Sequence, residues 1–175
     1  MNELKRRAWG DVVLWVTLIY STLYIVRPAC EYLKKITPFA LLTNIFMWVA
    51  LAATAAILIF KTGIKKPSTF IFLALAVIIY GISFLKVQYP EEKIHFLEYG
   101  ILSFLIFRAC RFSMGVYAAY GCAFLLTSIL GWGDEGIQGL LPNRYYQTSD
   151  VLLNGFSGAL GLLLTFIFER EHRGS

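Results

Sequence analysis

Charged residues are scarce in this sequence. Asp, Glu, Lys and Arg make up 15% of its 175 residues, while hydrophobic residues make up 58%. An ordinary soluble domain has roughly 25% charged residues. The mean hydropathy of +0.64 agrees with this imbalance. A water-soluble fold is therefore not expected, and the chain is better counted in membrane-spanning helices of about 20 residues, of which six fit.

The sequence also lacks the signatures of soluble enzymes. It has no Gly-x-Ser-x-Gly elbow, phosphate-binding loop, dinucleotide fingerprint or HExxH zinc motif. Its net charge of +5 comes from short basic clusters between apolar runs. No basic patch with interleaved aromatic residues, as expected of a nucleic-acid interface, is present. We expect no nucleic-acid partner and no metal site, and no cofactor can be named.

Cysteine is rare as well. Cys30, Cys110 and Cys122 form an odd set without metal-ligand spacing. The expected topology puts them at different depths, which predicts free thiols. No soluble domain, linker or internal repeat is visible, so residues 1–175 are expected to form a single membrane domain.

Six segments separated by short polar loops predict an all-α polytopic bundle of about six transmembrane helices. The first is expected to remain uncleaved and to end at Arg27–Pro28, because proline removes a backbone donor. Ser68 is the expected N-cap of the third. The fourth is shorter and more charged than the rest. The predicted spans are Val12–Val26, Phe39–Phe60, Ser68–Leu85, Glu92–Arg108, Gly115–Trp132 and Val151–Phe168.

Positive residues in short loops predict the orientation. Placing both termini in the cytoplasm of a bacterial inner membrane puts ten Lys and Arg residues inside and six outside. The polar stretches 91–98, 134–144 and 150–154 then all lie on the outer side.

Those outer stretches carry the side chains that are able to do chemistry. Helical spacing puts His95, Glu98 and Tyr99 on one face. Gln138 shares a face with Asp134 and Glu135 if the fifth helix continues that far. Asp150 suits an N-cap, with Asn154 one turn later. Ionisable groups at a membrane boundary usually pair or line a cavity, so we expect one shared polar pocket that includes Arg144.

Three interpretations of this pocket stay open. Arg144 and Lys93 could neutralise Glu98, Glu135 and Asp150 in a purely structural network. Arg144 could instead offer a forked donor to a phosphate or carboxylate of an envelope component. Alternatively, His95 or Glu98 could act as a general acid or base. Metal binding by these residues has only weak support, because no ligand motif is present.

Small residues form a stripe in the last helix. Gly155, Gly158 and Gly161 recur every third residue. Such stripes let helices approach closely, so this one is expected to pack inside the bundle or against a second copy or another membrane subunit.

The order and spacing of these motifs resemble the VanZ-like family of small bacterial membrane proteins over residues 91–164. The matching pieces are Glu92-Lys-Ile-His-Phe-Leu-Glu-Tyr99, Asp134-Glu-Gly-Ile-Gln138, Pro142-Asn-Arg144 and Asp150-Val-Leu-Leu-Asn154. Asn143 stands where many relatives have glycine, and asparagine should preserve the turn. The family is named for a protein associated with teicoplanin resistance, so the resemblance implies a role in the cell envelope.

We therefore expect an outer-leaflet pocket that binds or modifies an anionic lipid-linked or glycan-linked envelope component, with a possible link to glycopeptide resistance. The catalytic candidates are His95, Glu98 and Glu135, and the ligand-binding candidates are Tyr99, Asp134, Gln138, Arg144, Asp150 and Asn154. The alternative is a non-catalytic accessory subunit of a larger membrane complex, in which the polar cluster is structural.

Overall fold

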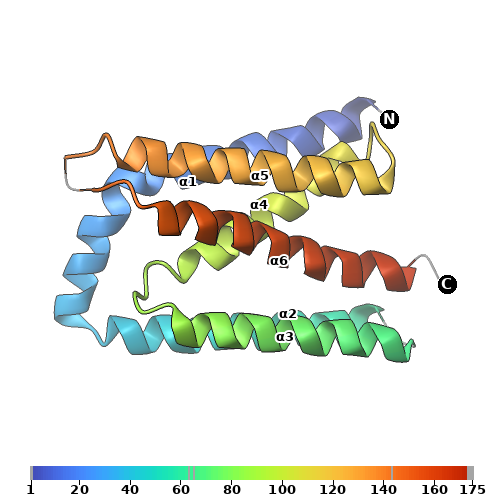
Figure 1. Cartoon of the computed structure of the whole chain (residues 1–175), viewed down its shortest axis with the longest axis horizontal. Coiled ribbons are helices and arrows are strands. Elements are labelled where there is room, and N and C mark those ends of the chain that lie inside the picture. Colours follow the sequence, from blue (N-terminus) through green and yellow to red (C-terminus); the bar gives the residue numbers. More distant parts are fainter. Residues whose placement is uncertain (1, 63, 65, 143, 173–175) are drawn as a thin grey trace. The chain divides into compact units, whose positions relative to one another are not determined.

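The computed structural model describes residues 2–62, 64, 66–142 and 144–172, and these residues form six α-helices and no strand (Figure 1). The all-α prediction is therefore confirmed over the described part of the chain. Short connections join the helices, so consecutive helices can pack together. The helices are α1 (Asn2–Ile36), α2 (Phe39–Thr62), α3 (Pro67–Lys86), α4 (Ile94–Cys110), α5 (Val116–Gln138) and α6 (Thr148–His172).

Five helices of the described residues are long and apolar enough to cross a membrane: α1, α2, α3, α5 and α6. The remaining helix, α4, has 17 residues. Large apolar side chains on the outer surfaces are exposed, among them Phe60 at 84% and Leu85 at 78%. Such exposure costs little when lipid replaces water. These features indicate a multi-pass membrane protein.

Tertiary contacts divide the chain into two compact units. Unit 1 comprises Met1–Tyr32 and Ile94–Leu162, and unit 2 comprises Leu33–Lys93 and Leu163–Ser175. Unit 1 contains most of α1, all of α4 and α5, and most of α6. Unit 2 contains α2, α3 and the ends of α1 and α6.

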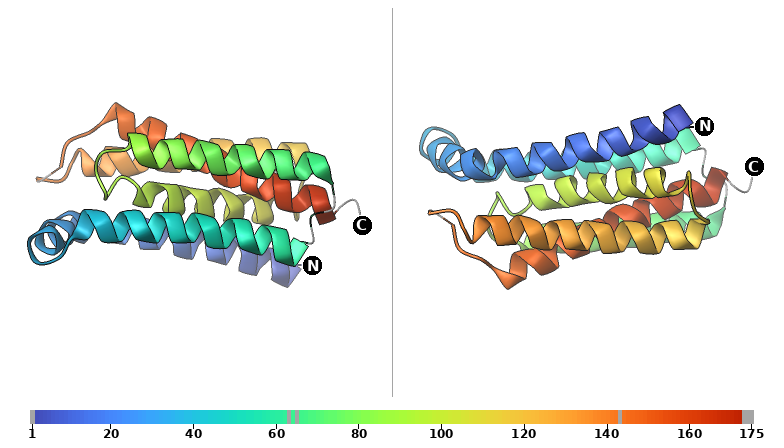
Figure 2. Two further views of the ribbon diagram at one scale, coloured as in Figure 1. Left: turned by 90° about the horizontal axis from the view of Figure 1, so that it is seen from below. Right: turned by 90° about the horizontal axis from the view of Figure 1, so that it is seen from above.

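The core of unit 1 lies where α4 and α5 pack against the first part of α1 (Figure 2). Ala119 and Ala123 of α5 are fully buried, and their small side chains let α5 approach α4 closely. Larger side chains fill the remaining space. They include Val12, Ile19, Leu102, Ile106 and Phe107.

The glycine stripe of α6 packs within unit 1. A Cβ atom added at Gly158 would come within 2.7 Å of Thr127 Cγ2 on α5, and one added at Gly161 would come within 2.6 Å of Gly100 Cα on α4. Gly155 has more room, with Ser128 Oγ at 3.5 Å. The first of the two expected roles of the stripe, close packing inside the bundle, is therefore observed.

Unit 2 is built on α2, α3 and the end of α6. Leu58, Leu73, Ala76 and Ile167 form its buried cluster. Near the end of α6, the Arg170 guanidinium lies 5.2 Å from the centre of the Phe72 ring, and a cation–π contact of this kind holds the chain end to α3.

The predicted end of the first helix is wrong. α1 continues through Pro28 to Ile36, a length of 35 residues, and Figure 1 shows that it bends along its length. Proline removes one hydrogen bond and bends a helix, but membrane helices tolerate it because neighbouring groups satisfy the freed carbonyl. The sequence-based prediction therefore gave too much weight to the helix-breaking effect of Pro28.

Other boundaries shift by a few residues. α3 begins at Pro67 with Lys66 as its N-cap, and not with Ser68, because proline suits the first helical position. α6 begins at Thr148, so Asp150 lies in its first turn and is not the N-cap. α5 continues through Gln138, as the predicted shared face requires. The turn expected at Asn143 lies outside the described residues.

No disulfide joins Cys30, Cys110 or Cys122, as predicted. Their expected separation in depth is wrong for one pair, however. Cys110 Sγ, at the end of α4, lies 3.2 Å from Cys122 Sγ on α5. The connection between these helices brings the two thiols to the same level.

Candidate functional site

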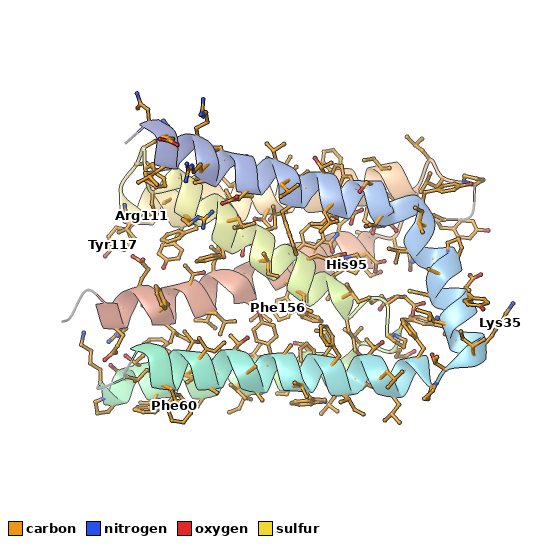
Figure 3. The ribbon with its side chains drawn as sticks, turned by 180° about the vertical axis from the view of Figure 1, so that it is seen from behind. Lys35, Phe60, His95, Arg111, Tyr117 and Phe156 are labelled. Atoms are coloured by element: carbon orange, nitrogen blue, oxygen red, sulfur yellow. The ribbon has the colours of Figure 1, made fainter. Side chains whose placement is uncertain are left out.

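The predicted site residues meet at one end of unit 1. The first turns of α4, the last turns of α5 and the first turns of α6 lie at this end (Figure 1). It is called the polar end below. Figure 3 shows His95 at the beginning of α4, with Arg111 and Tyr117 at the opposite end of the unit.

A continuous series of hydrogen bonds crosses the polar end, and we call it the Tyr99–Arg144 series. The Tyr99 hydroxyl donates to Asp134 Oδ2 at 2.6 Å, and Gln138 Nε2 donates to Asp134 Oδ1 at 3.1 Å. Arg144 Nη1 then donates to Gln138 Oε1 at 2.7 Å, and Nη2 reaches the Leu23 carbonyl at 3.4 Å. The series fixes the position of the Arg144 guanidinium from three helices.

These polar side chains are deeply buried. Tyr99, Asp134, Glu135 and Asn154 have no exposed surface, and Gln138 and Asp150 are 3% and 7% exposed. A buried polar group that lacks a partner costs about 1–3 kcal/mol. The internal hydrogen bonds of the Tyr99–Arg144 series therefore account for the burial of Tyr99, Asp134 and Gln138 at this place.

Helical spacing also brings His95, Glu98 and Tyr99 together, as predicted. The rings of His95 and Tyr99 stack with centroids 5.9 Å apart, and His95 Nδ1 lies 3.7 Å from Glu98 Oε2. The side chains of His95 and Glu98 are 14% and 25% exposed, so both are partly accessible, while the His95 Nδ1 atom itself is buried. Trp15 Nε1 donates to the Glu98 carbonyl and joins α1 to this turn.

Glu135, Asp150 and Asn154 lie where α5 and α6 face each other. Asn154 Nδ2 donates to the Gly131 carbonyl at 3.1 Å, and Glu135 Oε2 accepts from the Gln147 backbone N–H at 3.3 Å. Gly131 has no side chain, which lets Asn154 approach, since an added Cβ would lie 2.7 Å from Asn154 Cβ. Glu135 is close enough to Asp150 for their charges to interact.

A small pocket, which we call the arginine pocket, opens beside Arg144. Its volume is about 60 Å³, and it is lined by Leu23, Tyr24, Arg27, Pro28, Leu141, Pro142 and Arg144. This volume is sufficient for a small polar group. Two arginines from distant parts of the sequence therefore line one partly apolar hollow.

The contribution of α1 to this pocket was missed at the sequence level. Arg27 follows an apolar run and belongs to the same predicted side of the membrane as Arg144, and that was the available signal. The contribution of α1 was missed because the helix was predicted to end at Arg27–Pro28. Leu23, Arg27 and Pro28 present one surface only when α1 continues.

Lys93 has a hydrogen-bond partner within unit 2. Its Nζ donates to Asn44 Oδ1 at 2.5 Å, and both residues belong to unit 2. Burial lowers the pKa of Lys93. Glu91, also in unit 2, pairs with Lys34 at 2.7 Å. Arg144 is thus the cation that the described contacts place in the hydrogen-bonded series.

The chemistry of the polar end rests on carboxyl, imidazole and guanidinium groups. Within the described residues, no three His, Cys, Asp or Glu side chains are grouped together. Donors from guanidinium groups suit a phosphate or carboxylate, and the accessible His95–Glu98 pair could transfer a proton.

Comparisons with known proteins add no assignment: no family model, no curated protein and no solved structure matches this chain.

Proposed function

We propose that this chain is a VanZ-like protein of the bacterial inner membrane that binds the anionic group of a lipid-linked or glycan-linked envelope component. The observation that carries the proposal is the arginine pocket, in which Arg27 and Arg144 line a hollow shared with Leu23, Leu141 and two prolines. In this proposal both termini are cytoplasmic, and the polar end lies at the outer leaflet.

The position of Arg144 supports this proposal. Its guanidinium is tied to Gln138 and to the Leu23 carbonyl, so little side-chain entropy is lost when a ligand binds. A guanidinium in a partly desolvated site forms strong hydrogen bonds to phosphate or carboxylate oxygens. The apolar lining suits the part of a lipid-linked molecule next to its charged group.

Modification of the bound component is a narrower form of the proposal. The His95–Glu98 pair is partly exposed, and its separation of 3.7 Å places an imidazole beside a carboxylate, two groups that serve in general acid–base catalysis. Glu135 is the third catalytic candidate. An Ala variant of His95 that binds normally but no longer turns over the ligand would support catalysis.

The binding proposal is tested with the full chain in detergent, by native mass spectrometry with phosphatidylglycerol, undecaprenyl phosphate and phosphatidylcholine. We expect the anionic lipids to bind and Arg144→Gln to weaken them by at least about tenfold, because a charge-assisted hydrogen bond contributes about 1.5–3 kcal/mol. Arg111→Gln, at the opposite end of unit 1, is the matched control. Equal binding of all three lipids, or no effect of Arg144→Gln in a folded variant, would refute the proposal.

A second candidate is a non-catalytic subunit of a larger membrane complex. It is favoured by the internal pairing of the Tyr99–Arg144 series, which needs no ligand to satisfy Asp134 or Gln138. Purification in a mild detergent separates the two: stoichiometric partner proteins support the subunit, and bound anionic lipid on a monomer or homodimer supports the pocket. A link to teicoplanin is tested by measuring the susceptibility of cells with and without the protein.

A further inference from the structure

The register between α5 and α6 is fixed by two contacts. Asn154 bonds to the Gly131 carbonyl, and the face of Gly158 meets Thr127. Thr127 is one helical turn before Gly131, and Gly158 is one turn after Asn154, as antiparallel packing requires. One turn further towards the polar end, the same register sets Glu135 opposite Asp150.

Oxygen atoms without a hydrogen-bond donor gather along this interface. Among the described residues, Glu135 Oε1 and Asn154 Oδ1 are buried and have no hydrogen-bond partner. The Asn154 amide oxygen can only accept hydrogen bonds. Glu135 Oε1 is likewise limited to accepting them when the carboxyl is ionised. Asp150 adds a second carboxylate, whose Oδ1 accepts from Ser149 at 3.3 Å.

None of the hydrogen bonds among the described residues reaches Glu135 Oε1 or Asn154 Oδ1. Arg144 Nη1 and Nη2 donate to Gln138 and Leu23, and the Asn154 amide nitrogen donates to Gly131. The described donors Arg144 Nε and Thr127 Oγ1 have no partner, so they do not bond to these oxygens either. Two facing carboxylates in a buried setting repel each other unless something neutralises them. A proton shared by Glu135 and Asp150 would ease the repulsion but would leave Asn154 Oδ1 without a partner.

We propose that Glu135, Asp150 and Asn154 bind a hard divalent cation of the Mg²⁺ or Ca²⁺ class between α5 and α6. Glu135 Oε1, an Asp150 oxygen and Asn154 Oδ1 are its protein ligands, and water completes the coordination. Carboxylate and amide oxygens are the preferred ligands of these ions, and Mg²⁺ commonly uses only one or two carboxylates together with water. The ion neutralises both acids and engages both unpartnered oxygens at once.

The test uses the full chain in detergent, stripped with EDTA, and Mn²⁺ as a paramagnetic probe. We expect one Mn²⁺ to bind, displaced by excess Mg²⁺ or Ca²⁺. Glu135→Gln and Asp150→Asn should each weaken it by at least about tenfold, since even the loss of an outer-sphere partner commonly costs 10–100-fold. Glu3→Gln is the control, because Glu3 is exposed and pairs only with Arg7 among the described ion pairs.

Three results would overturn the proposal: no Mn²⁺ binding by the wild-type chain, binding that persists in Glu135→Gln, or an infrared band of a protonated carboxyl that Glu135→Gln removes without any Mn²⁺ site. If the acid variants do not fold, the unfolding temperature of the wild-type chain must still rise with Mg²⁺ and fall with EDTA. Arg144→Gln removes a positive charge that acts on Glu135 and should not weaken Mn²⁺ binding, so a failure of the headgroup proposal is separable from a failure of this one.

Discussion

Individual hydrogen bonds stabilise the buried polar residues of unit 1. Tyr99 is fully buried, and its hydroxyl donates to Asp134 at 2.6 Å. Replacing Tyr99 with Phe removes this donor and leaves one oxygen of a buried carboxylate without its tyrosine partner.

We predict that Tyr99→Phe lowers the free energy of unfolding by about 1.5–3 kcal/mol, the usual contribution of a hydrogen bond to a charged group. Denaturation in detergent micelles, followed by circular dichroism, measures the change. Tyr117→Phe is the matched control, because Tyr117 is 89% exposed and should have no effect. Equal stability of the two variants would show that Asp134 does not depend on the phenol.

The contact between the Cys110 and Cys122 thiols predicts selective oxidation. With Sγ atoms 3.2 Å apart, a small shift permits a disulfide. A two-electron oxidant should join this pair, each thiol losing one proton and the pair losing two electrons. Peptide mass spectrometry after alkylation should show Cys30 alkylated and the other two linked. If Cys30 is linked instead, or all three thiols are alkylated, the predicted proximity is wrong.

At the scale of helices, the glycine stripe of α6 gives an internal comparison. An added Cβ at Gly161 would meet the Gly100 backbone, whereas one at Gly155 would meet only Ser128 Oγ at van der Waals distance. Backbone atoms cannot move aside as a side chain can, so the two positions should differ.

Gly161→Ala is predicted to destabilise the chain by about 1–3 kcal/mol, the usual cost of overpacking, while Gly155→Ala should be nearly neutral. Thermal unfolding in one detergent compares the variants directly. A loss that is equal at both positions would contradict the packing of α6 on α4.

Hydrophobic runs predicted five of the six described helices, because a run of about 20 apolar residues has few alternatives to a membrane span, while α4 is shorter. They did not predict where α1 ends. Pro28 signals a helix end in water, but the helix continues because bilayer surroundings favour backbone hydrogen bonds within the helix. The extension of α5 to Gln138 could be stated only as a condition, since its last turn is polar and lacks the apolar signal.

The sequence predicted which residues belong to the candidate site, but it did not predict their hydrogen-bond partners in other helices. Spacing along α4 gave the His95, Glu98 and Tyr99 face, since contacts three and four residues apart follow from helix geometry. No local rule could give the Tyr99–Asp134 bond or the carbonyl of Leu23 as a partner of Arg144. Those contacts depend on how helices far apart in the sequence pack.

For the whole molecule, the apolar surfaces of five helices indicate an integral membrane protein. In the proposed topology, the polar end of unit 1 faces outward and the α4–α5 connection faces the cytoplasm. In a variant with Cys30, Cys110 and Cys122 replaced by Ser, single cysteines at the exposed positions Ser149 and Ser113 report the two sides.

We predict that a membrane-impermeant maleimide labels Ser149→Cys in intact cells and labels Ser113→Cys only after permeabilisation. The chain should also stay in the membrane pellet after alkaline carbonate extraction, as expected of a protein with spanning helices. The reverse labelling pattern would invert the topology and move the arginine pocket to the cytoplasmic leaflet.

The Tyr99–Arg144 series has a consequence for evolution and design of the pocket. Gln138 holds the Arg144 guanidinium, Asp134 holds Gln138, and the Tyr99 phenol holds Asp134. If the proposed headgroup binds there, its selectivity should therefore depend on residues that do not line the pocket. A conservative change at Tyr99 should loosen the bracing and reduce discrimination between phosphate and carboxylate headgroups, although the pocket walls remain chemically unaltered.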